Sequence, residues 1–83
     1  MLCIFKNINI FFSKLTFLRL FFCENGIFLN YADDNKIGGV ETENTIRNNV
    51  VGILINRCIY YNHKLKNNNE FENNSIDIKI NLI

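Results

Sequence analysis

The sequence predicts an α+β fold made of an N-terminal helix, an acidic β-hairpin, a second helix and a C-terminal strand. Three patterns lead to this prediction: apolar residues spaced by three and four, turn-forming residues between two β-prone segments, and alternating apolar and polar residues near the C-terminus. The 83 residues suffice for one small domain. Hydrophobic residues make up 48% of the chain, which is enough for a core and argues against disorder throughout.

The first predicted helix covers the N-terminal segment from Leu2 to Phe22. Its apolar residues recur with the period of one broad buried helical face: Leu2, Phe5, Ile8, Phe12, Leu15, Leu18 and Phe22. Further Phe and Leu residues spread beyond that face, so the helix is expected to contact neighbours on several sides.

The predicted hairpin has Asp33 and Asp34 at its tip. Glu24-Asn25-Gly26 is a turn signal, and the β-prone segment from Ile27 to Tyr31 follows it. Asp and Asn tolerate the backbone angles of a tight turn, so Lys36-Ile37 is expected to begin the returning strand.

The C-terminal half predicts a second helix, a loop and a strand. Thr42 is a candidate helix cap, and the helix is expected to run to about Tyr60. The apolar residues of its buried face recur by three to five: Ile46, Val50, Ile53 or Leu54, and Cys58. The Asn-rich stretch 66–75 is expected to be a mobile loop. From Ile76 to Leu82 apolar and polar residues alternate, as in a half-buried strand. We identify no internal repeat in the sequence.

Charge and cysteine content narrow the function classes. The net charge is +1 and the basic residues do not cluster, which disfavours independent nucleic-acid binding. Cys3, Cys23 and Cys58 resemble neither a disulfide framework nor a zinc knuckle, and they favour a reducing compartment. Cys58 and His63 supply too few ligands for a closed metal site, so both are expected to be ordinary packing or surface residues.

Localisation is expected to be intracellular, in the cytoplasm or nucleus. The apolar N-terminal segment is interrupted by Lys6, Lys14 and Arg19, so it fits neither a membrane-spanning helix nor a signal peptide.

The segment Tyr31-Ala32-Asp33-Asp34 resembles the Tyr-X-Asp-Asp box of reverse transcriptases, in the form common in non-LTR retrotransposons. The following residues 35–40, Asn-Lys-Ile-Gly-Gly-Val, are similar to the Thr-Lys-Leu-Gly-Gly-Val type of continuation found in LINE elements, and the helix predicted over 41–58 lies where that family has one. Residues 2–9 look like a degraded form of an upstream family helix. The resemblance implies that residues 1–83 are a single partial palm segment of an RNA-directed DNA polymerase.

The resemblance also implies roles for individual residues. Asp33 would be the catalytic metal ligand and Asp34 a weaker or supporting ligand of Mg²⁺ or Mn²⁺, because hard divalent cations prefer carboxylate oxygen. Tyr31 and Ala32 would line the groove for nucleotide and primer. RNA template and DNA primer would be the partners of a full-length relative. No Asp precedes Asp33, so the earlier metal ligand has no counterpart, and the isolated chain is expected to be inactive and to bind neither partner.

Two alternatives remain open from the sequence. The chain could be a small non-enzymatic protein whose N-terminal segment lies on a membrane or a partner, with Lys6, Lys14 and Arg19 directed to acidic headgroups. It could also be a decayed reading frame. An acidic pair at a turn is, moreover, ordinary turn chemistry.

Overall fold

The computed structural model describes residues 3–6, 14–32, 35–39, 41–58 and 65–81. The described residues form nine strands and no helix: β1 (Ile4–Lys6), β2 (Lys14–Leu15), β3 (Arg19–Phe21), β4 (Asn25–Asn30), β5 (Lys36–Ile37), β6 (Thr45–Arg47), β7 (Val51–Asn56), β8 (Glu70–Glu72) and β9 (Ile76–Asn81). The α+β prediction is therefore wrong.

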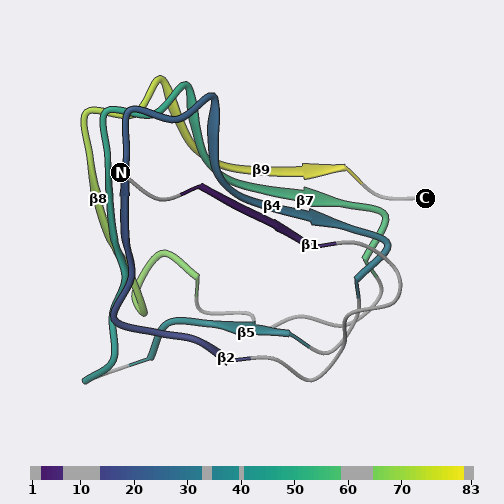
Figure 1. Ribbon diagram of the computed structural model, residues 1–83, viewed down its shortest axis with the longest axis horizontal. Helices are drawn as coiled ribbons and strands as arrows, with labels where there is room; N and C mark the ends of the chain where they lie inside the picture. The colour runs from purple at the N-terminus through teal and green to yellow at the C-terminus, as the bar shows by residue number, and fades with distance from the viewer. Residues whose placement is uncertain (1–2, 7–13, 33–34, 40, 59–64, 82–83) are drawn as a thin grey trace.

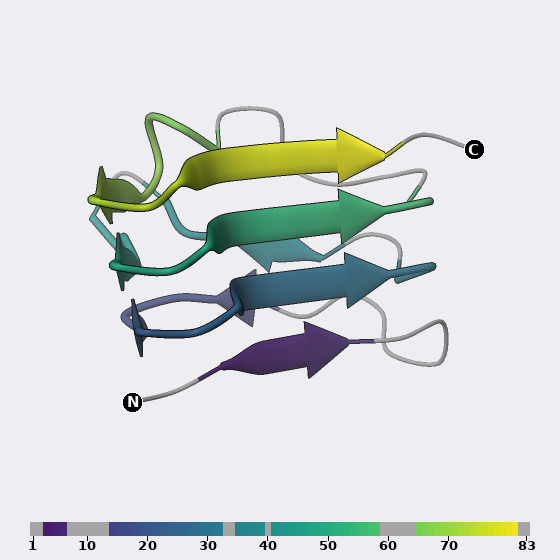
Figure 2. The same ribbon diagram turned by 90° about the horizontal axis from the view of Figure 1, so that it is seen from above.

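The strands stack into three parallel sheets that surround one core (Figures 1 and 2). The orders are β1-β4-β7-β9, β2-β5 and β3-β6-β8, and every described pair is parallel. The chain thus winds as a β-solenoid. We call one circuit a rung: β1 to β3 form the first rung, β4 to β6 the second, and β7 and β8 the third, while β9 begins a fourth.

A repeat of 25 or 26 residues underlies the rungs, contrary to the absence of repeats inferred from the sequence. Ile27 pairs with Ile53, 26 residues later, and Ile53 pairs with Ile78, 25 residues later. In this register, residues 21–27 (FFCENGI), 47–53 (RNNVVGI) and 72–78 (ENNSIDI) occupy equivalent places. Only scattered positions are similar between the three segments, which is why the repeat is hard to recognise.

The predicted N-terminal helix is replaced, within its described part, by three short strands of the first rung. Phe17 and Phe22 have positive φ angles of 56° and 57°, and they form the corners on either side of β3. Side chains of a strand point inward at every second residue, and each corner interrupts this alternation. The core residues of a solenoid are therefore irregularly spaced in the sequence. This irregular spacing imitated the three-and-four period of a helix.

The second predicted helix is also wrong, because β6 and β7 occupy its place. Within β7 the inward positions Val51, Ile53 and Ile55 are buried and alternate with a period of two. Val50, which the helical pattern placed on the buried face, is 55% exposed. The β-branched residues of this segment favour strands, and their propensity agrees with the structure.

The hairpin prediction located its strands correctly but paired them incorrectly. β4 covers most of the predicted Ile27 to Tyr31 strand, and β5 coincides with Lys36-Ile37. However, β4 pairs in parallel with β1 and β7, whereas β5 pairs with β2 in a different sheet. The two strands on either side of the acidic pair therefore form no hairpin.

The C-terminal prediction is confirmed for the strand, which the structure places at Ile76–Asn81. The preceding stretch 66–75 contains β8 in addition to turns and bends.

The core lies between the three sheets and consists of small and aliphatic side chains. Its buried members form one cluster: Leu15, Leu20, Ile27, Leu29, Ala32, Ile37, Ile46, Ile53, Ile55, Cys58 and Leu65.

Candidate functional site

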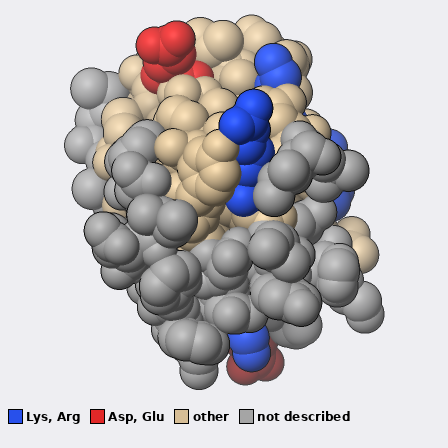
Figure 3. All heavy atoms as spheres, turned by 90° about the vertical axis from the view of Figure 1, so that its right-hand side faces the viewer, with Lys and Arg blue, Asp and Glu red and all other residues tan. Residues whose placement is uncertain are grey.

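Tyr31, which the resemblance places in a nucleotide groove, lies just after β4 at an exposed corner. Its φ angle is 53°, and its backbone N–H donates to the carbonyl of Asn56 at 3.0 Å. Arg57, one rung further on, donates from Nη1 to the Tyr31 hydroxyl at 2.5 Å and lies 5.7 Å from the ring centroid. Tyr31 is thus held by a hydrogen bond and a cation–π contact on the surface. Figure 3 views the molecule from the side on which β4, β7 and β9 end, with basic atoms in its upper half and at its lower edge and acidic atoms at its top and lower edge.

The remaining residues of the motif do not form a described site. Ala32 is fully buried in the core cluster, so its side chain lines no surface groove. Asp33 and Asp34 lie outside the described residues, and their metal-binding role stays a prediction. Among the residues that the structure describes, no group of three or more His, Cys, Asp or Glu side chains is arranged to hold a metal ion. Cys58 is buried, and His63 lies outside the described ranges.

Two exposed phenylalanines at the ends of β3 are the most unusual surface feature of the described chain. The side chains of Phe17 and Phe22 are 72% and 70% exposed. Both residues adopt left-handed backbone conformations, which are unfavourable for a bulky side chain. The positions equivalent to Phe22 in the next two rungs are Asn48 and Asn73, also at positive φ. Asn tolerates this conformation, so Phe22 is the exception among three equivalent corners.

The charge of the first rung differs from that of the rest of the chain. Up to Cys23 the sequence contains Lys6, Lys14 and Arg19 and no acidic residue. Arg19 is exposed on β3, between the two phenylalanines. The third rung instead carries Glu70 and Glu72 on the equivalent strand β8. The first rung therefore combines exposed aromatic rings with positive charge.

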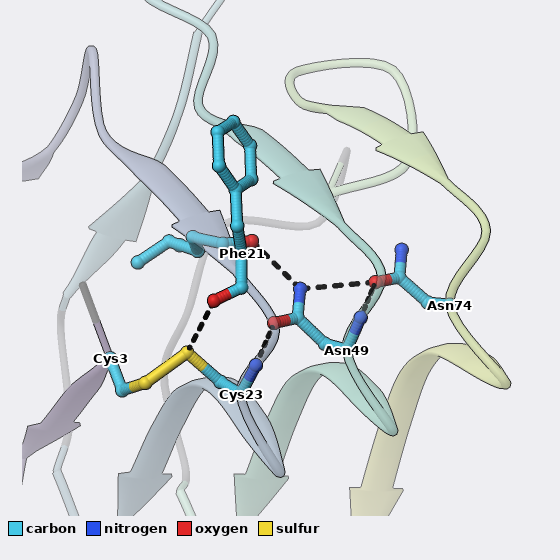
Figure 4. Close-up of a disulfide and its surroundings, with 6 residues drawn as sticks. Cys3, Phe21, Cys23, Asn49 and Asn74 are labelled. Atoms are coloured by element: carbon cyan, nitrogen blue, oxygen red, sulfur yellow. Dashed lines mark hydrogen bonds between the residues drawn. A yellow bond between two sulfur atoms is a disulfide. The ribbon is translucent and has the colours of Figure 1, made fainter. Parts of the chain in front are cut away.

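Buried asparagines connect the rungs at the two corners next to the β3-β6-β8 sheet. Asn49 accepts a hydrogen bond from the backbone N–H of Cys23 at 2.8 Å and donates from Nδ2 to the Leu20 carbonyl and to Asn74 Oδ1 (Figure 4). Asn49 is only 3% exposed, so these bonds replace all the water that its amide would bind.

A second asparagine ladder follows the same rule. The Oδ1 atom of Asn44 accepts from the backbone N–H of Leu18 at 2.9 Å, and its Nδ2 atom donates to Asn69 Oδ1, also at 2.9 Å. These ladders are structural. The sequence signal for the first ladder is the pair of asparagines that recurs at 48–49 and 73–74, and for the second it is the same 25-residue spacing between Asn44 and Asn69.

A disulfide joins Cys3 to Cys23 and ties the start of β1 to the corner after β3 (Figure 4). The prediction that the cysteines form no disulfide is therefore wrong. The sequence could not reveal this pair, because Cys3 and Cys23 are brought together only by the circuit of the first rung. Cys23 also occupies the place that Asn49 and Asn74 hold in the later rungs.

Comparisons with protein-family models, with curated proteins and with solved structures gave no match. Among the described residues there is no helix of the length and hydropathy needed to cross a membrane. The parallel strand pairing and the surface of the first rung define the class of protein: a small parallel β-solenoid with an aromatic and basic first rung.

Proposed function

We propose that the chain is a non-enzymatic protein that associates peripherally with anionic membranes through the exposed aromatic and basic residues of its first rung. The observation that carries the proposal is the exposure of Phe17 and Phe22 in strained corner conformations. Strain of this kind costs about 1–3 kcal/mol per residue and is characteristic of functional positions. The two positions equivalent to Phe22 are Asn48 and Asn73, so folding does not require an aromatic residue at that corner.

The chemistry of the first rung fits the boundary between lipid headgroups and acyl chains. Burying an exposed Phe side chain contributes about 1.5–3 kcal/mol, and Phe17 and Phe22 protrude from the same rung. A basic residue near an anionic surface adds about 1 kcal/mol, and Arg19 lies between the two rings in sequence. Together these contributions support reversible binding to the membrane surface.

Vesicle flotation tests this proposal. Wild-type protein should float with vesicles of phosphatidylcholine and phosphatidylglycerol, and binding should weaken as salt is added because the charges are screened. The double variant Phe17→Asn and Phe22→Asn should lose binding. Arg19→Gln should reduce the partition coefficient about fivefold, which corresponds to the loss of about 1 kcal/mol.

The matched control is Val50→Asn, which removes an exposed apolar side chain from a corner of the second rung. This variant should bind vesicles like wild type. If wild type does not float, or if Val50→Asn lowers binding as much as the double variant, membrane association is wrong. If neither wild type nor Val50→Asn binds vesicles, the result would favour a protein partner for Phe17 and Phe22.

The Cys3–Cys23 disulfide favours an oxidising compartment over the cytoplasm or nucleus, since structural disulfides persist mainly under oxidising conditions. The reducing compartment expected from the sequence rested on the separation of the cysteines along the chain. Because Cys3 and Cys23 are bonded in the structure, their separation no longer supports a reducing compartment.

The reverse transcriptase resemblance stays a prediction carried by the motif at residues 31–34. Its expected structural context, a helix followed by an acidic hairpin and a second helix, is contradicted by the described strands. We therefore base the proposed function on the first rung.

A further inference from the structure

The third-rung asparagines of the two ladders, Asn74 and Asn69, donate to other acceptors than the second-rung asparagines do. In the second rung, Asn49 and Asn44 each donate from Nδ2 to the Oδ1 atom of the asparagine one rung further on, at 3.0 Å and 2.9 Å. An asparagine in the third rung would need the same acceptor from a fourth rung. Each third-rung asparagine instead finds a substitute within the chain.

Asp77 supplies the first substitute. Asn74 donates from Nδ2 to Asp77 Oδ1 at 3.1 Å, which replaces the amide oxygen that a next rung would provide. The backbone of the 65–69 turn supplies the second, because Asn69 donates from Nδ2 to the Leu65 carbonyl at 2.9 Å. Both ladders are therefore satisfied without a further rung.

A second observation concerns the row formed by Gly26, Gly52 and Asp77, which are equivalent positions in successive rungs. A Cβ atom added at Gly26 would lie 2.6 Å from the Gly52 carbonyl oxygen, and one added at Gly52 would lie 2.6 Å from the Asp77 carbonyl oxygen. Stacking of a following rung thus requires glycine at this position. Asp77 has a side chain at the position where Gly26 and Gly52 have none, so it does not meet this requirement.

Lys66 holds the Asp77 side chain in place. Its Nζ atom lies 2.7 Å from Asp77 Oδ2, and it also lies 5.6 Å from the centroid of the Phe71 ring in β8. One carboxylate oxygen of Asp77 is thus bound to a ladder asparagine and the other to a lysine.

We infer that Asp77, held by Lys66, closes the β9 edge against in-register pairing with a strand from a second copy of the chain. The Cβ atom of Asp77 occupies the space that the carbonyl of an added strand needs. Its carboxylate would also be buried by that strand, which is costly for a charged group. Charged side chains on exposed strand edges commonly prevent such pairing in β proteins.

Exposed apolar side chains on β9 explain why its edge needs protection against pairing. Ile76 and Ile80 belong to the inward row of the sheet, yet they are 44% and 40% exposed. Their apolar surface would favour stacking of a second copy on this end of the solenoid. The blocked backbone edge of β9 opposes this stacking of a second copy.

The test is the association state of the full chain in solution without vesicles, measured by sedimentation velocity over a range of concentrations. Asp77→Gly should raise the apparent self-association constant by about tenfold or more, because it removes both the Cβ block and the charge. Asp77→Asn keeps the Cβ atom and a ladder acceptor, so it should remain monomeric like wild type. Lys79→Gly removes an exposed charged side chain from the same strand and is the matched control, also expected to be monomeric.

Hydrogen exchange at β9 keeps the inference testable even if Asp77→Gly does not fold. In wild type the degree of protection of the β9 amides should not depend on protein concentration. Concentration-dependent protection in wild type would overturn the inference. So would a folded Asp77→Gly variant that stays monomeric, or an Asp77→Asn variant that associates as strongly as Asp77→Gly.

Discussion

Asn49 shows how a single polar residue stabilises the solenoid. Its side chain accepts from the Cys23 N–H and donates to Leu20 and Asn74, so one amide connects three rungs. The amide is nearly inaccessible to water, and no described side-chain nitrogen or oxygen is buried without a hydrogen-bond partner. A neutral amide is needed at this position because it must both donate and accept.

Asn49→Asp is therefore expected to be strongly destabilising. The carboxylate keeps the acceptor but loses both donors, and it places a buried negative charge beside the Leu20 carbonyl and Asn74 Oδ1. We expect a loss of about 3 kcal/mol or more in the free energy of unfolding, measured by urea denaturation.

The neighbouring Asn48 offers the matched control for this change. Asn48 is exposed and adopts a positive φ angle that Asp also tolerates. Asn48→Asp should change stability by less than about 0.5 kcal/mol. Equal effects of the two substitutions would show that the ladder is not the source of the stability.

The acidic pair allows a second prediction at the residue scale, which follows from the motif. If Asp33 and Asp34 bind a divalent cation, Mn²⁺ should selectively broaden the NMR signals of residues near Tyr31 and Asn35. The double variant Asp33→Asn and Asp34→Asn should abolish this broadening, whereas Asp77→Asn, a control acidic site, should preserve it. Diffuse broadening in wild type would reduce the motif to a solvated acidic turn.

At the scale of the elements, the disulfide determines how firmly β1 is held. β1 is three residues long and is an edge strand that pairs only with β4 among the described strands. Cys3 immediately precedes it, and the bond to Cys23 closes a loop with a sequence separation of 20 residues. Such a cross-link stabilises the folded state by lowering the conformational entropy of the unfolded chain. It therefore holds β1 in place more firmly than a few hydrogen bonds at a sheet edge would.

Cys3→Ser should lower the free energy of unfolding by about 3 kcal/mol, as expected for the loss of a loop of this size. The effect should be reproduced by reduction of wild type and should be absent when reductant is added to the variant. Alkylation of unfolded, unreduced wild type should modify one cysteine, Cys58, which lies outside the disulfide. Modification of all three cysteines in protein from its native compartment would contradict the disulfide and the oxidising location.

The β-strand elements themselves were only partly predictable. The strand near the C-terminus and the segments of β4 and β5 have local signals, namely alternation and β-branched or aromatic residues. The choice of partner for each strand has no local signal, because parallel pairing joins residues about one rung apart in the sequence. Phe-rich sequence in the first rung was ambiguous since corners at Phe17 and Phe22 break the strand period.

At the scale of the whole molecule, stability should respond to acid through Asp77. The hydrogen bond from Lys66, the hydrogen bond from Asn74 and the charge of Lys66 together lower the pKa of Asp77 below its ordinary value of 3.8, although partial burial opposes them. The folded state therefore binds this proton less readily than the unfolded state. The resulting stability is present above pH 3.8 and is lost as the pH falls below it towards the lower folded-state pKa.

Thermal unfolding between pH 6 and pH 2 checks this expectation. The Lys66–Asp77 pair is partly exposed, so its contribution should be below about 1 kcal/mol. The acid-induced loss of stability should be smaller in Asp77→Asn than in wild type. If the stability of wild type and of Asp77→Asn depends on pH in the same way, Asp77 does not contribute to the loss of stability in acid.

The sequence by itself determined the amount of apolar material, the positive charge of the N-terminal segment, the resemblance at residues 31–34 and the local β-tendency of three segments. Only the tertiary structure decided that these segments pair in parallel, that Cys3 meets Cys23, and that Asn49 lies in the core while Phe17 and Phe22 lie outside it. The physical reason is that each of these features depends on contacts between successive rungs, and local propensity contains no information about which residues one circuit of the chain will superimpose.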